Sequence, residues 1–76
     1  MDNMKTGNSI QFGRAIRERR KELGYTQRDL ASFTGLSISF ISDLERGKKT
    51  AELEKTLFIA GMLGLDVVVE PRGVGR

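Results

Sequence analysis

The stretch TQRDLASFTGLSISFISDLERG, residues 26–47, constrains the fold more than any other part of this chain. Thr26 can cap a helix, and Asp29, three residues later, completes the pattern of a capping box. We expect that helix to occupy 27–34, because Gly35 can adopt the left-handed conformation that ends a helix. The first half of the stretch therefore predicts one short helix with a defined start and end.

A second helix is predicted directly after the first. Ser37 can cap it, Gly47 can end it, and its expected range is 38–45. Two helices that cross at roughly 90–120° after a 3–4-residue turn need a small residue where they nearly touch, and Ala31 meets that need. The apolar residues that would fill the angle between the helices are Leu30, Leu36, Ile41 and Leu44. This spacing predicts a helix-turn-helix, with the polar residues of its second helix on the outside.

The composition excludes several classes of function. Seventy-six residues allow one domain. The core of so small a domain is thin, and oligomerisation can add further buried surface. The chain has no cysteine and no histidine, so the usual metal ligands and the commonest general base are missing, and we expect no metal, cofactor or catalysis. The net charge of +3 is compatible with nucleic acid. No apolar run could span a bilayer and no signal-peptide core is present, so we expect a cytoplasmic protein without a membrane partner.

The motif and the residues after it resemble a known family. TQRDLA, then GLS, then FISDLERGK is similar to the Xre/Cro/phage-repressor family of helix-turn-helix DNA-binding proteins. The continuation GKKTAELEKTLFIAGMLGLDVVVEP resembles more narrowly the HipB-type antitoxins, which partner a HipA kinase toxin and repress their own operon. The resemblance covers residues 10–71. It implies an all-α, phage-repressor-like bundle, double-stranded DNA as a partner, and a HipA-like toxin kinase as a further partner.

The remaining residues divide into two tails around a single domain. We expect flexible tails over 1–8 and 71–76, and a DNA-binding and dimerisation domain over 9–70. A first helix is predicted over 10–23, with an inner side formed by Phe12, Ile16 and Leu23. A fourth helix is predicted over 53–63, with an apolar stripe of Leu53, Leu57, Ala60 and Leu63 that Ile59 and Met62 widen. Gly61 within it is expected to mark a close approach to a neighbouring element.

The segment LDVVVE, residues 65–70, predicts a strand because three valines follow one another, and Pro71 ends it. A lone strand leaves its backbone groups unpaired, so we expect it to pair with the same strand of a second copy about a two-fold axis. The HipB resemblance implies the same intersubunit sheet. The alternative is a frayed apolar tail. The residues expected in the dimer strand are Leu65, Val67, Val68 and Val69.

One charged pair is expected to be structural. Arg20 lies on the inner side of the first helix, so its charge needs a partner, and Glu45 at the end of the motif is the candidate. In the Xre family the matching arginine and glutamate form an ion pair, and the resemblance implies the same pair here. Removing one member would leave the other charge partly buried and unpaired.

Polar and basic residues around the motif are candidates for phosphate contacts. In the family the residue matching Gln27 hydrogen-bonds a phosphate and braces the second helix, and the helix N-terminus offers N–H groups that suit an anion. The alternative for Gln27 is an ordinary exposed residue, and for the cations after the second helix it is compensation of the helix dipole. The phosphate candidates are Thr26, Gln27, Arg28, Arg46, Lys48 and Lys49.

The first exposed residues of the second helix are those that read base edges in such a motif. The candidates are Ser37, Ile38, Ser39, Ser42 and Asp43. Serine can donate or accept at several base edges, and isoleucine can meet a thymine methyl. The set contains no arginine, asparagine or glutamine, so we expect DNA shape and a second half-site to add discrimination. Asp43 either reads a cytosine amino group or points away and solvates the helix, and Phe40 is expected to be partly packed.

Three functions fit these features. The first is a homodimeric repressor of a two-fold-related operator that also acts as a HipB-like antitoxin, restrains a HipA-like kinase and represses its own operon. The second is a stand-alone Xre-type regulator or the antitoxin of an unrelated toxin. The third is a protein-interaction module that no longer binds DNA. An enzymatic function is the least expected, because no nucleophile–base pair or set of metal ligands is present in the sequence.

Overall fold

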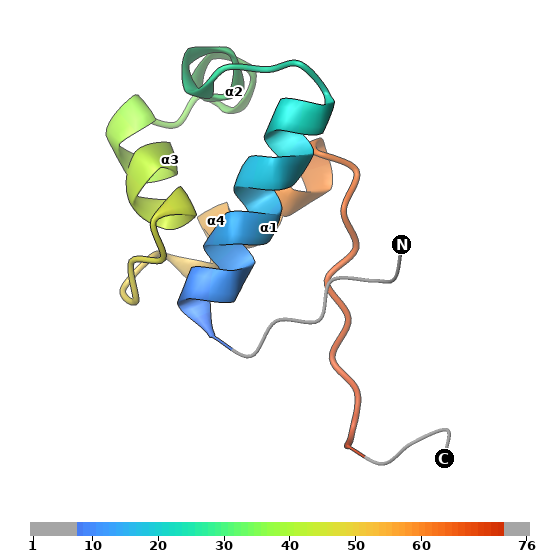
Figure 1. Cartoon of the computed structure of the whole chain (residues 1–76). Helices are drawn as coiled ribbons and strands as arrows, with labels where there is room; N and C mark the ends of the chain where they lie inside the picture. Colours follow the sequence, from blue (N-terminus) through green and yellow to red (C-terminus); the bar gives the residue numbers. More distant parts are fainter. Residues whose placement is uncertain (1–7, 73–76) are drawn as a thin grey trace.

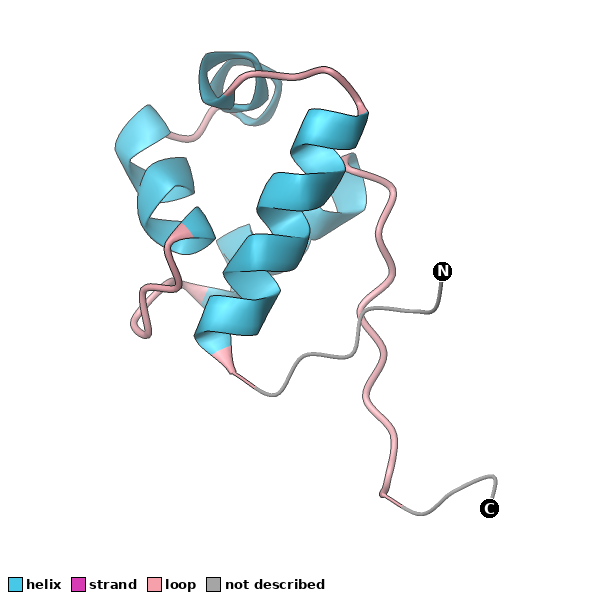
Figure 2. Ribbon diagram, viewed as in Figure 1, coloured by secondary structure: helices cyan, strands magenta, loops and turns pink. Residues whose placement is uncertain are grey.

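The computed structural model describes residues 8–72 and contains four helices in that range (Figure 1). Their bounds are α1 Ser9–Glu22, α2 Gln27–Thr34, α3 Ile38–Glu45 and α4 Leu53–Met62. Helices and loops account for all of the described range, and no strand is present there (Figure 2). The all-α prediction and all four helices are confirmed, each bound within one residue of its predicted position.

The helix ends follow from the residues that cap them. In the capping box of α2, the Thr26 hydroxyl accepts from the Asp29 amide and the Asp29 carboxylate accepts from the Thr26 amide, both at 2.9 Å. Gly35 ends α2 with a φ of 76°. The Ser37 hydroxyl accepts from the Phe40 amide at 2.9 Å and starts α3. The predicted helix-turn-helix is therefore fixed locally, by side chains within the motif.

The core lies where the four helices meet. Its fully buried side chains come from every helix: Ile16, Leu30, Ile41, Leu44, Ile59, Ala60 and Leu63. Each large side chain removed from water contributes about 1.5–3 kcal/mol, so these few residues supply most of the stabilisation of a domain this small. Phe12, Leu36 and Phe40 are partly buried around them. The predicted interior of the motif, Leu30, Leu36, Ile41 and Leu44, is confirmed.

Helix α1 packs very closely on the C-terminal end of α3. A Cβ atom added to Gly13 would lie 2.3 Å from the Leu44 carbonyl oxygen and 2.8 Å from that of Glu45. The Ser9 hydroxyl donates to the Gly47 carbonyl at 2.8 Å. The first turns of α1 thus fix the position of α3 through backbone contacts that no larger side chain at position 13 would permit.

Two predicted inner faces are partly wrong. Leu23 is 39 % exposed, and on α4 Leu53 and Leu57 are 71 % and 43 % exposed. The predicted Ala60, Leu63 and Ile59 are buried, as is Thr56, which was not predicted, whereas Met62 is 45 % exposed. Helix α4 is apolar on nearly all sides, so its helical spacing did not determine which side would pack. Thr56 tolerates burial because its hydroxyl donates to the Glu52 carbonyl at 2.6 Å.

The close approach predicted at Gly61 is also wrong. A Cβ atom added there would meet nothing within 4 Å. Gly13, rather than Gly61, is the glycine within a helix whose lack of a side chain permits a close contact.

The predicted strand over 65–70 is absent from this single chain. The segment leaves the end of α4 as irregular backbone that passes beside α1 and then continues beyond the helices (Figure 1), and Val67, Val68 and Val69 are 41 %, 52 % and 94 % exposed. A strand needs a neighbour for its backbone hydrogen bonds, and no neighbouring strand lies in the described range. The expectation of a strand is therefore not met by one copy of the chain.

The predicted tails, 1–8 and 71–76, lie mostly outside the described residues. Asn8, at the boundary, caps α1: its side-chain carbonyl accepts from the Gln11 amide at 2.9 Å. None of the helices in the described range has both the length and the apolar character needed to cross a membrane.

Candidate nucleic-acid interface

Helix α3 presents a polar, exposed side opposite its buried one. Ile41 and Leu44 anchor it in the core. Ser37, Ile38 and Ser39 at its N-terminal end are exposed, and Ser42 and Asp43 one turn later are half-buried. A short helix anchored on one side and free on the other can be inserted into a groove of a partner molecule. All five base-contact candidates belong to this helix or its cap.

Glu45 holds the C-terminal end of α3 against two other helices. Arg20 of α1 forms a two-pronged pair with it, at 2.7 Å from Nε to Oε2 and 2.9 Å from Nη2 to Oε1. Arg20 and Glu45 are only 7 % and 8 % exposed. Arg20 also donates to the Tyr25 carbonyl at 2.8 Å. The predicted structural ion pair is present, with every buried polar atom of its side chains partnered.

The same pair sets the ionisation of Arg20. The hydrogen bond with Glu45 raises the pKa of Arg20, and the smaller opposing effect of burial does not cancel it. A cation whose pKa is higher in the folded state contributes its full stabilisation below the unfolded-state value and loses it only as the pH rises through the folded-state value. This contribution of Arg20 is therefore complete at neutral pH.

Gln27, a predicted phosphate contact, is tied to the same carboxylate. Its side-chain Nε2 donates to Glu45 Oε1 at 3.0 Å and links the first turn of α2 to the last residue of α3. The bond uses one of the two hydrogens on that nitrogen. The two helices of the motif are thus joined by a polar bridge in addition to their apolar contacts.

The other residues near the start of α2 face solvent. Thr26 is exposed, and its hydroxyl is engaged in the capping box. Arg28 is exposed, and no ion pair involves it within the described residues. The N-terminus of α2 and the Arg28 side chain therefore lie on the solvent side of the motif.

The predicted cations at the end of α3 are not equivalent. Arg46 Nη2 lies 2.6 Å from Asp43 Oδ1, and Lys48 Nζ lies 3.4 Å from Asp43 Oδ2. Lys49 is exposed and forms no ion pair in the part of the chain that the structure describes. Sequence reasoning missed that Asp43 pairs with two of the three cations. The spacing of Asp43 and Arg46, three residues apart on one helix, is the signal that could have revealed it.

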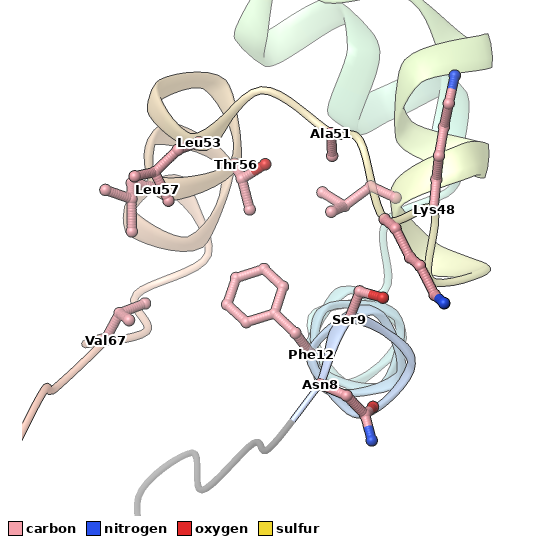
Figure 3. Close-up of a pocket in the computed structure, with 11 residues that line it drawn as sticks. Asn8, Ser9, Phe12, Lys48, Ala51, Leu53, Thr56, Leu57 and Val67 are labelled. Carbon is pink, nitrogen blue, oxygen red and sulfur yellow. The ribbon is translucent and has the colours of Figure 1, made fainter.

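An open apolar groove lies beside this motif, between α1 and α4. It has a volume of about 340 Å³, and Phe12 of α1 points into it toward Leu57 of α4 (Figure 3). Leu53 and Val67 extend its apolar lining, and Lys48 and Lys49 border it on the side of α3. The groove thus joins the exposed side of α4 to the segment after it.

The helix-turn-helix and the residues around it match a known protein family. The model of the helix-turn-helix family HTH_3 matches residues 16–69, which include the whole motif and most of the chain. The chain belongs to the HTH_3 family. It is therefore a helix-turn-helix transcriptional regulator of the Xre type, with a DNA-binding fold, as the resemblance of the motif implied.

Relatives with curated descriptions agree with the HTH_3 assignment. The uncharacterized HTH-type transcriptional regulator y4mF of Sinorhizobium fredii is 38 % identical over 65 residues, which are 86 % of each chain. The HTH-type transcriptional regulator DdrOP3 of Deinococcus deserti is 36 % identical over 52 residues, which are 68 % of this chain and 40 % of that protein.

Solved structures of HipB share the fold. A HipB variant in complex with an O2 20mer superimposes with a TM-score of 0.83 at 24 % identity, over 93 % of this chain and 99 % of that one. A HipB–O4 20mer complex gives a TM-score of 0.80 at 25 % identity, over 90 % and 96 % of the two chains. The structure of this HTH_3 regulator is thus HipB-like over nearly its whole described length.

Proposed function

We propose that this protein is a sequence-specific transcriptional repressor that inserts α3 into the major groove of DNA. The observation that supports this most directly is the exposed N-terminal end of α3, held in place by the buried Arg20–Glu45 pair and the apolar core. In this docking Ser37, Ile38 and Ser39 reach base edges, with Ser42 one turn further along. The HipB complexes that share this fold contain 20mers, which is consistent with such a role.

Phosphate contacts complete the proposed docking. In this docking one DNA strand meets the start of α2, where the half-buried Gln27, the exposed Thr26 and Arg28 and the backbone N–H groups would contact its phosphates. Arg46, Lys48 and Lys49 face the backbone at the far end of α3. Contacts of this kind fix orientation, whereas the α3 residues discriminate between sequences.

The proposed repressor acts as a homodimer. Val67 lines an apolar groove with the exposed Leu53 and Leu57 of α4, and the exposed Val68 and Val69 follow it, so a second copy can cover this apolar area. Pairing of residues 65–70 with the same segment of the partner would satisfy backbone groups that one copy leaves without a strand neighbour. Two α3 helices related by a two-fold axis would then read half-sites about one helical turn apart, or a multiple of it.

We further propose that the regulator is a HipB-like antitoxin that binds and restrains a HipA-like kinase and represses the operon encoding both. The similarity of fold to HipB supports this role. Two alternatives remain in competition: a stand-alone Xre-type regulator, and the antitoxin of an unrelated toxin. Co-purification with a kinase encoded next to this protein favours the antitoxin role, and its failure at micromolar concentrations favours the alternatives.

Two variants test the docking of α3. Gln27→Ala is expected to weaken binding to all duplexes alike, because the proposed contact is to backbone. Ser39→Ala is expected to relax preference at one base position by about 1 kcal/mol and to leave unrelated DNA unaffected. Dissociation constants are measured on the upstream duplex and on a panel with each base pair replaced. If both variants keep wild-type affinity and base preference, α3 does not dock as proposed. The protein is then better interpreted as a protein-interaction module.

A further inference from the structure

Asp43 is held by two cations instead of standing free on α3. Its Oδ1 lies 2.6 Å from Arg46 Nη2, and its Oδ2 lies 3.4 Å from Lys48 Nζ. The second terminal nitrogen of Arg46, Nη1, donates to the Ser42 hydroxyl. Both carboxylate oxygens and both terminal nitrogens of the guanidinium are thus engaged within one cluster, which we call the Asp43 cluster: Ser42, Asp43, Arg46 and Lys48.

The Asp43 cluster places an acidic group between two cations that face the proposed phosphate backbone. Its formal charge is +1, where Arg46 and Lys48 alone would give +2. The Arg46 and Lys48 side chains are 68 % and 55 % exposed, whereas that of Asp43 is 29 % exposed. Ion pairs this exposed are weak, so a DNA phosphate can displace the Asp43 carboxylate. The phosphate must nevertheless compete with that carboxylate for Arg46 and Lys48.

We propose that Asp43 is a specificity-determining residue that acts through Arg46 and Lys48, a role that rests on the proposed DNA binding. By holding these two cations, it lowers the affinity for unrelated DNA more than the affinity for the operator. Binding to unrelated DNA comes essentially from phosphate contacts, so a partly neutralised cation weakens it directly. On the operator, the base-edge contacts at the start of α3 hold the helix in one register and so limit how closely Arg46 and Lys48 approach the phosphates, whereas on unrelated DNA these cations are free to take their strongest phosphate contacts.

The test compares Asp43→Asn with Glu18→Gln. Asparagine keeps the size of the side chain and removes its charge. Glu18 is exposed and lies on the side of α1 opposite its buried residues, so Glu18→Gln makes the same change in net charge away from α3. Dissociation constants are measured for the upstream duplex and for a shuffled duplex of equal length, over a series of salt concentrations. Thermal melts by circular dichroism establish that each variant is folded at the assay temperature.

Asp43→Asn is expected to steepen the salt dependence on shuffled DNA. The slope of log affinity against log salt becomes more negative by about 0.9 for each cation released. Affinity for the shuffled duplex rises roughly twofold to fivefold, in keeping with the strength of exposed ion pairs, and affinity for the upstream duplex rises less. Glu18→Gln changes the slope much less. The ratio of the two affinities, which measures specificity, falls only in Asp43→Asn.

A background lacking both cations tests whether Asp43 acts through them. With Arg46→Met and Lys48→Met in place, adding Asp43→Asn is expected to leave the slope and the affinity ratio unchanged. An effect that persists in this background would overturn the proposal, because Asp43 would then repel phosphate directly. Loss of operator affinity in Asp43→Asn with no change on shuffled DNA would also overturn it, since Asp43 would then read a base. Absence of salt-sensitive DNA binding by the wild-type protein would instead remove the proposed function, and this inference with it.

Discussion

At the scale of single residues, Glu45 is a polar group that joins three helices. It accepts two hydrogen bonds from Arg20 and one from Gln27, so one carboxylate joins α1, α2 and the end of α3. A charge in this position is stabilising only while its partners are present. Its loss therefore affects both folding and the placement of α3.

Glu45→Ala is expected to lower the free energy of unfolding by about 3–5 kcal/mol, because it leaves the Arg20 guanidinium buried without its partner. Replacing both residues, as Arg20→Met with Glu45→Leu, is expected to cost much less, since no charge then remains buried. Urea denaturation of the three proteins measures the difference. A double variant as unstable as Glu45→Ala would contradict this expectation, because the ion pair itself would then contribute several kcal/mol to the free energy of unfolding.

The residue scale is also where the sequence predicted most. The capping residues Thr26, Asp29 and Ser37 and the turn residue Gly35 act within a few positions of themselves, so their roles follow from local chemistry. The partner of Arg20 was predicted through a family resemblance. The pairing of Asp43 was missed, because Asp43 was expected either to read a base or to solvate the helix, and its three-residue spacing to Arg46 was not used.

At the scale of elements, the contact between α1 and α3 depends on one glycine. Gly13 lets the backbone of α1 reach the last carbonyls of α3, where a methyl group would lie 2.3 Å from an oxygen atom. The sequence did not reveal this contact, because helical spacing gives the face of a helix but not the distance to its neighbour. For the same reason it placed the exposed Leu53 and Leu57 on the inner side of α4, whose apolar residues surround the helix.

Gly13→Ala is expected to destabilise the fold by about 2 kcal/mol, even though alanine is the better helix former, because the contact is with backbone that cannot move aside. Gly61→Ala is the matched control. It places a methyl group in open space on α4 and is expected to stabilise the fold by roughly 0.5–1 kcal/mol. Thermal unfolding of both variants measures the effects, and a stabilised Gly13→Ala would contradict the close packing of α1 on α3.

At the scale of the whole molecule, one copy of the chain leaves an apolar surface uncovered. Leu53, Phe58 and Met62 on α4 and the valines after it are exposed, although the buried core is small. No sequence pattern or single-chain structure contains the partner that would cover this surface. The dimer consequently stays a prediction, argued from exposed apolar area and from unpaired backbone.

Val68→Asp is expected to weaken the proposed dimer at least tenfold, since it places a charge in the centre of the pairing segment. Val68→Thr keeps the β-branched shape and serves as the control, with a much smaller effect expected. Sedimentation over a range of protein concentrations gives the dissociation constants. A Val68→Asp protein that sediments as the wild-type dimer would exclude pairing through residues 65–70.

One titration tests most directly whether the protein binds a specific DNA site as a dimer through α3. The purified wild-type protein is titrated against its own upstream DNA at two salt concentrations, with sedimentation of the complex in parallel. We predict tight binding by a dimer, with an affinity that falls steeply as salt rises, by a slope of about 0.9 for each phosphate contact. A dimer that ignores this DNA at both salt concentrations would contradict this prediction and favour a protein-interaction module.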